Sequence, residues 1–173
     1  MARVAFIVGD MFEDSELQVP YDRIQETGHE AVVIGVEAGA KLEGKKGTTV
    51  TTDVSIDDVD PSGFSALVIP GGYSPDKIRS NKKMVELTRS IFEAGKPVAA
   101  ICHAGWMLAE AGIAAGKTLT SYHSIKTDLI NAGANWVDQE VVEDGNLITS
   151  RTPQDLDAFT KTLLSQIERG LGG

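Results

Sequence analysis

Short apolar runs alternate with segments of helical character along most of the chain. The apolar runs, each predicted to be a buried strand, are residues 3–8, 29–35, 66–69 and 97–101. Helices are predicted from apolar spacing or composition at residues 13–26, 82–94, 103–111 and 125–132. Pro20 lies inside the first of these helices and is expected to kink or weaken it. This alternation predicts an α/β fold whose mostly parallel central sheet is covered on both faces.

Turn-forming residues add two hairpins and a final helix to this pattern. Thr/Val-rich runs separated by glycines predict a hairpin within residues 41–54. A Glu-Asp-Gly-Asn turn predicts another within residues 140–150. Thr152 is expected to be the N-cap of the last helix, with Pro153 as its first residue and Asp155 in its first turn.

Composition favours one domain and excludes several kinds of partner. No repeat, low-complexity stretch or linker divides the sequence, so residues 1–173 are expected to form a single domain. The net charge of −9, from 16 Lys and Arg against 25 Asp and Glu, disfavours binding to nucleic acid. The doublets Lys45-Lys46 and Lys82-Lys83 are expected to be solvated surface. No apolar run is long enough to cross a membrane. A single cysteine without a recognisable signal peptide indicates a reducing, cytoplasmic setting.

The single cysteine, Cys102, lies between the strand predicted at residues 97–101 and the helix that follows. A residue at such a junction stands on a sharp turn with its side chain above the sheet, an arrangement called a nucleophile elbow. The start of a helix also supplies positive potential and free N–H groups, which favour a reactive thiolate. The alternative is an inert, buried cysteine, and the pattern alone leaves both open.

Three loops follow predicted strands and are expected to converge at the carboxyl edge of the sheet: residues 9–14, 71–76 and 102–105. Gly71 and Gly72 would let backbone N–H groups bind an oxyanion, although a plain tight turn has the same composition. Glu13 and Glu16 share a helix face, and one of them could reach the thiol. Acidic residues also favour the start of a helix for electrostatic reasons alone.

Two histidines are candidate partners of the cysteine. His103 is its neighbour, and His123 lies in a Ser-Tyr-His-Ser motif that also holds Tyr122. Either histidine could orient or deprotonate the thiol. No second cysteine and no clustered ligand spacing is present, so no metal is expected. The glycines form neither a dinucleotide-binding nor a phosphate-binding motif, so no cofactor is expected.

These stretches together resemble the PfpI-type intracellular cysteine protease and deglycase family, within the class I glutamine amidotransferase-like superfamily. The matching motifs lie at residues 12–16, 67–72, 74–76, 100–103, 120–126, 131–136 and 149–153. They run along the whole chain with little insertion. The sequence departs from the family pattern in two places. Ala104-Gly105 follow Cys-His where members often have Gly-Pro, and Asp76 stands where protease-like members carry the longer Glu.

The resemblance implies a flavodoxin-like three-layer sandwich with Cys102 as the nucleophile on its elbow. It also implies that a protonated Glu16 hydrogen-bonds the thiol and that His103 completes a triad with Asp76 of a neighbouring subunit. The backbone N–H groups of Gly72 and His103 would form the oxyanion hole. A homodimer is then the smallest functional unit, and hexamers built from such dimers occur in the family.

A shallow elbow with a small acidic pocket suits small electrophiles better than folded proteins. The leading hypothesis is therefore a stress-protection enzyme that acts on reactive carbonyls. It would be a protein or nucleotide deglycase, or a glyoxalase III-like enzyme that converts methylglyoxal to lactate. One alternative is an intracellular cysteine peptidase acting on short peptides. The other is a non-enzymatic sensor of oxidative stress, or a chaperone, that works through oxidation of Cys102.

Overall fold

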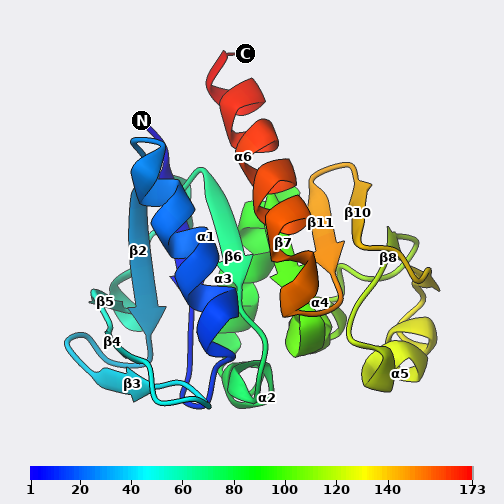
Figure 1. The fold of residues 1–173 in the computed structure, drawn as a ribbon, viewed down its shortest axis with the longest axis horizontal. Helices are drawn as coiled ribbons and strands as arrows, with labels where there is room; N and C mark the ends of the chain where they lie inside the picture. The colour runs from blue at the N-terminus through cyan, green and yellow to red at the C-terminus, as the bar shows by residue number, and fades with distance from the viewer. Residues whose placement is uncertain (173) are drawn as a thin grey trace.

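Seven strands form one central sheet in the computed structural model, which describes residues 1–172 (Figure 1). Their order is β10-β11-β7-β6-β1-β2-β5, and every neighbouring pair is parallel except β10 with β11. The bounds are β1 (Arg3–Ile7), β2 (Glu30–Gly35), β5 (Val54–Ser55), β6 (Ala66–Ile69), β7 (Val98–Ile101), β10 (Val141–Asp144) and β11 (Leu147–Ser150). Gly173, the last position of the predicted domain, lies outside the described residues.

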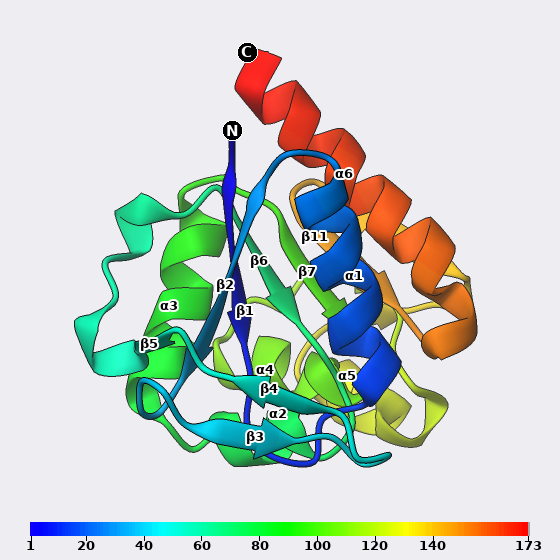
Figure 2. The same ribbon diagram turned by 60° about the vertical axis from the view of Figure 1, so that its left-hand side comes forward.

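Helices cover both faces of this sheet. Their bounds are α1 (Asp14–Glu26), α2 (Ser74–Ile78), α3 (Lys82–Glu93), α4 (Gly105–Glu110), α5 (Lys126–Asn131) and α6 (Leu156–Gly172). Helices α1 and α6 lie side by side on one face, and α3 and α4 cover the other (Figures 1 and 2). Successive side chains of β1 point to opposite faces of the sheet. Phe6 packs in the core under α1 and α6, whereas Ile7 packs in the core under α3 and α4. The predicted flavodoxin-like three-layer sandwich is confirmed.

Smaller elements complete the fold. The first predicted hairpin consists of β3 (Lys41–Glu43) and β4 (Thr49–Thr51), and the second consists of β10 and β11. The parallel pair of β8 (Thr118–Leu119) and β9 (Asn135–Trp136) was not predicted, because two-residue strands are too short to show periodicity. Turns of 3-10 helix lie at Ile56–Asp58, Pro61–Gly63, Cys102–Ala104, His123–Ile125 and Pro153–Asp155. Among the described residues, no helix is long and apolar enough to span a bilayer.

Two local expectations concern the ends and the continuity of helices. Helix α1 continues across the buried Pro20, which removes the hydrogen bond to the Glu16 carbonyl without ending the helix, and the expected kink or weakening stays a prediction. Thr152 precedes a 3-10 turn that leads into α6, but its side chain makes no capping hydrogen bond. Asp155 stabilises this corner instead, since its Oδ2 accepts hydrogen bonds from the backbone N–H of Arg151 at 3.0 Å and from its Nε at 2.9 Å.

Candidate active site

Cys102 stands on the predicted strand-to-helix turn. Strand β7 ends at Ile101, and the next residue has a left-handed φ of +63°. Left-handed backbone is strained for a side chain with a Cβ, and such strain collects at functional sites. The cysteine is 9% exposed, so its side chain faces a cavity and not open solvent. The nucleophile-elbow geometry therefore follows from the backbone itself.

The three predicted loops converge on this cysteine. Phe12 and Gly72 form an isolated antiparallel bridge, and the Glu13 N–H donates to the Gly71 carbonyl at 3.1 Å. Gly72 has a φ of +80°, and a Cβ there would collide with the backbone of Glu13. A glycine is therefore required where the loop after β6 meets the loop after β1. Met11 adds a second left-handed residue, with a φ of +62°, which the sequence analysis did not anticipate.

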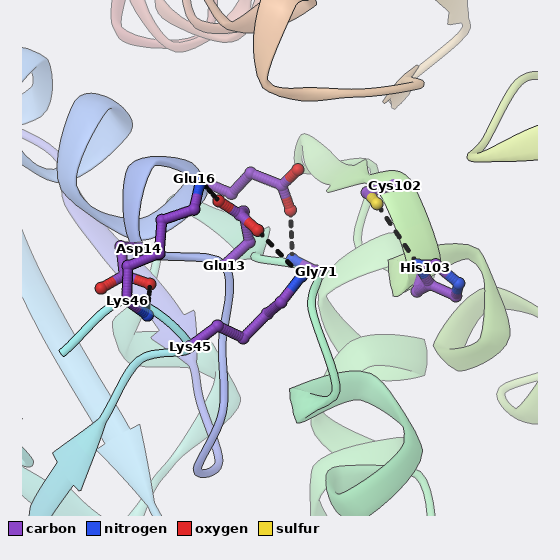
Figure 3. A network of polar contacts seen from close by, with 8 residues as sticks. All are labelled: Glu13, Asp14, Glu16, Lys45, Lys46, Gly71, Cys102 and His103. Atoms are coloured by element: carbon purple, nitrogen blue, oxygen red, sulfur yellow. Dashed lines mark hydrogen bonds and ion pairs between the residues drawn. The ribbon is translucent and has the colours of Figure 1, made fainter. Parts of the chain in front are cut away.

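Glu16 is the carboxyl group nearest to the thiol in this arrangement. Its side chain is fully buried, and Oε1 accepts a hydrogen bond from the Gly71 N–H at 2.8 Å. Figure 3 shows the carboxyl pointing from α1 toward Cys102. The other oxygen, Oε2, has no hydrogen-bond partner among the described residues. The Cys102 thiol nevertheless lies near enough to lower the pKa of the carboxyl slightly, against the larger effect of burial. Burial, with a smaller contribution from the charge of Glu13, raises the pKa of Glu16 to about 8.

The sequence suggested that the start of a helix would stabilise Cys102 as a thiolate, and the structure does not provide this stabilisation. Cys102 begins a short 3-10 turn, and α4 contains only six residues, so the helix dipole adds little. Burial and then the charge of Glu16 raise the pKa of the Cys102 thiol, against the N–H groups of His103 and Gly72, which lower it. Because the two acids share one buried site, they titrate as a pair. The first proton to leave creates a negative charge that opposes loss of the second.

His103 connects the cysteine to the wall of the cavity. Its Nδ1 lies 3.3 Å from Cys102 Sγ (Figure 3). Its Nε2 lies 3.2 Å from the Ser124 hydroxyl. Burial, and to a lesser degree the charges of Lys45 and His123, lower the pKa of His103. The imidazole is therefore neutral at neutral pH and able to accept a proton. Ser124 was not singled out from the sequence, because nothing in its motif indicates this contact.

The other predicted side chains lie farther from the sulfur. His123 is exposed and packs on the ring of Tyr122, which in turn stacks on His103 with centroids 4.9 Å apart. Asp76 is exposed on α2, and no hydrogen bond joins it to His103 within the described chain. Its predicted contact across a subunit interface remains a prediction.

Glu13 does not reach the thiol but binds two lysines. Its Oε2 lies 3.2 Å from Lys45 Nζ, and its Oε1 lies 3.0 Å from Lys46 Nζ. Both lysines are exposed, as expected for a solvated doublet, but the turn between β3 and β4 folds back over the site and pairs them with Glu13. Asp14 holds that turn by accepting hydrogen bonds from the N–H group of Lys46 at 2.8 Å (Figure 3) and from that of Thr48 at 2.8 Å.

A cavity of about 280 Å³ opens in front of the cysteine. Aromatic rings and a proline form much of its wall, and polar groups gather on one side; the lining residues are Glu13, Glu16, Lys45, Gly72, Tyr73, Cys102, His103, Trp106, Tyr122 and Pro153. The expected acidic character is not found, because two lysines offset Glu13 and Glu16 is protonated at neutral pH. A larger hollow near Lys96 and Asn146 has no cysteine or histidine among its described lining residues.

The described side chains offer no cluster of three or more His, Cys, Asp or Glu that could hold a metal ion. The cavity offers a thiol at Cys102, a protonated carboxyl at Glu16 and a neutral imidazole at His103. Such groups can perform nucleophilic attack and proton transfer.

Several known proteins are similar to this chain in sequence over nearly its whole length. Deglycase PfpI of Pyrococcus furiosus is 44% identical, with 96% of this chain and 99% of that protein aligned. Protein/nucleic acid deglycase 2 of Escherichia coli is 46% identical over 94% and 95%. The putative cysteine protease YraA of Bacillus subtilis is 45% identical over 96% and 98%.

A solved structure has the same fold as this chain. The crystal structure of a two-domain protein from Anabaena variabilis, with DJ-1/ThiJ/PfpI-like and ferritin-like domains, has 39% identity and a TM-score of 0.95. The match covers 97% of this chain and 48% of that one. The sequence model of the DJ-1/PfpI family matches residues 2–166. The chain therefore belongs to the DJ-1/PfpI family.

Proposed function

We propose that this protein is a cysteine-dependent enzyme of stress protection that removes reactive carbonyls, as a deglycase with glyoxalase III-like chemistry. The observation that carries the proposal is the pairing of Cys102 with the buried carboxyl of Glu16, whose pKa is raised to about 8. A carboxyl that titrates near neutral pH can both give and take a proton during turnover. Relatives named as deglycases support the assignment.

The reaction begins when the Cys102 thiol passes its proton to the neutral imidazole of His103 and the sulfur attacks the aldehyde carbon of methylglyoxal. The carbonyl oxygen takes up a proton, which gives a hemithioacetal. With a glycated amine the same attack displaces the amine, which leaves with a proton. A proton then moves from the former aldehyde carbon to the neighbouring carbon through an enediol, producing a lactoyl thioester. Water cleaves the thioester, and lactate and the free thiol result.

Backbone and imidazole groups have defined tasks in this scheme. The N–H groups of Gly72 and His103, which act on the sulfur in the resting site, would hold the oxyanion that forms beside it. The neutral His103 would relay protons. In the proposal Asp76 of a neighbouring subunit orients His103, so a homodimer is the smallest active unit and a hexamer is a further assembly of it.

The direct test is the release of lactate from methylglyoxal by the wild type, C102A and K161A. Lactate formation should vanish in C102A, because no other thiol exists in the chain. K161A is the control, because Lys161 is exposed on α6 and does not line the cavity. Its lactate formation should stay within about twofold of the wild type, since surface substitutions rarely perturb a site. Equal rates in the wild type and C102A would overturn the proposal.

A cysteine peptidase is the second candidate, and one contact favours it. The 3.3 Å approach of His103 Nδ1 to Cys102 Sγ is the nucleophile–base pairing that peptide cleavage needs. A relative named as a putative cysteine protease points the same way. Fluorogenic short peptides should then be cleaved by the wild type and not by C102A. The two activities are separated by comparing both substrates on one preparation, and peptide cleavage without lactate formation would favour the peptidase.

A further inference from the structure

Lys45 is the one lysine or arginine among the described residues that line the active-site cavity. It belongs to the turn between β3 and β4, which the backbone holds firmly over the site. The Lys45 N–H donates to the Phe12 carbonyl at 2.9 Å. Asp14 accepts hydrogen bonds from the backbone N–H groups of Lys46 and Thr48 in the same turn. A Cβ on Gly44 would meet the Asp14 carboxyl, so close packing fixes this turn from both sides. The position of Lys45 is thus built into the fold.

Lys45 brings a positive charge to the lining of the cavity. Glu13 is buried, and its two oxygens bind one lysine each, Lys45 at 3.2 Å and Lys46 at 3.0 Å. The nearby Asp14 carboxylate accepts backbone N–H groups of the turn and forms no ion pair with Lys45. Glu16 adds no negative charge at neutral pH, because burial keeps it protonated. In a chain with a net charge of −9, Lys45 is therefore a local positive site within reach of a ligand in the cavity.

The ammonium of Lys45 also has unused donors. Its Nζ makes one hydrogen bond, to Glu13, and lies 5.6 Å from the centroid of the Tyr73 ring. An ammonium carries three N–H donors, so two remain for a ligand. Lys46 is not placed to bind a ligand in the cavity, since its side chain is 71% exposed and does not line the cavity.

We propose that Lys45 selects substrates that carry a carboxylate close to the carbon attacked by Cys102. One ammonium group in the lining matches a monoanion, and a cavity of about 280 Å³ limits the substrate to a small molecule or a side-chain adduct. The substrate class is therefore carbonyl adducts of amino acids and other small carboxylates, in preference to neutral adducts of the same size. The identity of the reaction rests on the proposed function, but the recognition of the carboxylate does not.

The test uses two alkylating reagents that differ only in charge. The Cys102 thiolate displaces iodide from iodoacetate or iodoacetamide, forming a thioether with either a carboxylate or a neutral amide. Since the chain contains a single cysteine, mass spectrometry of the intact protein follows one site. The ratio of the two rate constants measures anion preference without any turnover. The same ratio in urea, where no cavity exists, provides the reference for each variant.

We expect the folded wild type to favour iodoacetate over iodoacetamide relative to this reference. In K45Q the preference should fall about fivefold, which is the effect of one partly exposed ionic contact. K45R should retain it, and K46Q is the matched control that removes the other lysine on Glu13 but should keep the preference. Added KCl should weaken the preference in the wild type. An unchanged ratio in K45Q, an equal fall in K46Q, or no labelling of folded Cys102 would overturn the inference.

A second arm connects recognition to turnover. Methylglyoxal adducts of N-acetylcysteine and of N-acetylcysteine amide form a carboxylate and neutral pair of similar size. K45Q should lower the ratio of kcat/KM for the first to that for the second by a similar factor. If the wild type turns over neither adduct while the alkylation ratio behaves as expected, the proposed function fails and the anion site stands. If turnover occurs but the ratio is the same in K45Q, the inference fails and the function stands.

Discussion

Burial of Glu16 should make the protein less stable as the pH rises, and E16Q should remove this dependence. The pKa of Glu16 increases from its ordinary value of 4.5 to about 8 in the folded chain. Between these values the folded state holds a proton that the unfolded state has released. The free energy of unfolding therefore decreases with increasing pH over this window and levels off above it. Glutamine has the same shape but no proton to lose, and its Oε1 can still accept the Gly71 N–H.

The size of the effect follows from the width of the window. Each pH unit inside it changes the free energy of unfolding by about 1.4 kcal/mol. Between pH 5 and pH 8 the wild type should therefore lose about 4 kcal/mol relative to E16Q. The comparison with E16Q isolates this loss, because His103 titrates in an overlapping range with the opposite sign. The lowered pKa of His103 makes its contribution increase as the pH rises.

Urea unfolding monitored by circular dichroism at fixed protein concentration, in steps from pH 5 to pH 9, would measure the difference. E26Q is the control, because Glu26 is exposed at the end of the same helix. Its stability should run parallel to that of the wild type. The reasoning is refuted if E16Q and the wild type remain parallel across the range, since Glu16 would then be ionised in the folded protein at neutral pH.

Two further substitutions test the architecture around the site. G71A would place a Cβ 2.8 Å from Cys102 Cβ and 2.9 Å from the Ile101 carbonyl, so we expect a loss of about 1–3 kcal/mol in urea unfolding. G170A, where a Cβ meets nothing within 4 Å, should not destabilise, and equal losses would contradict the steric argument. D155A should cost about 2 kcal/mol by removing the buried acceptor of Arg151. D155N should flatten the decrease in stability that the wild type shows as the pH falls below 3.8, and a retained decrease would refute the role of this carboxylate.

Features that depend on local sequence were predictable, and features that depend on packing were not. The strands around β7 and the turn at Cys102 follow from apolar runs and their ends, which nearby residues determine. Lys45 is exposed as expected, but its place at the cavity was not predicted, because a lysine doublet looks the same wherever the turn folds. Its place in the cavity depends on Asp14, more than thirty residues away along the chain. The charge state of Glu16 depends on complete burial, which no local pattern encodes.

The structure also bears on whether Cys102 is an inert core residue, which the sequence pattern left open. Left-handed backbone at Cys102 and at Met11 costs of the order of 1–3 kcal/mol each. A fully buried Glu16 with an unpartnered oxygen adds a further penalty. The sheet needs none of these features, since ordinary turns would end β1 and β7 equally well. All three nevertheless lie at one cavity, around the single cysteine. A chain selected for stability alone would have lost them, so their coincidence argues that Cys102 is there to react.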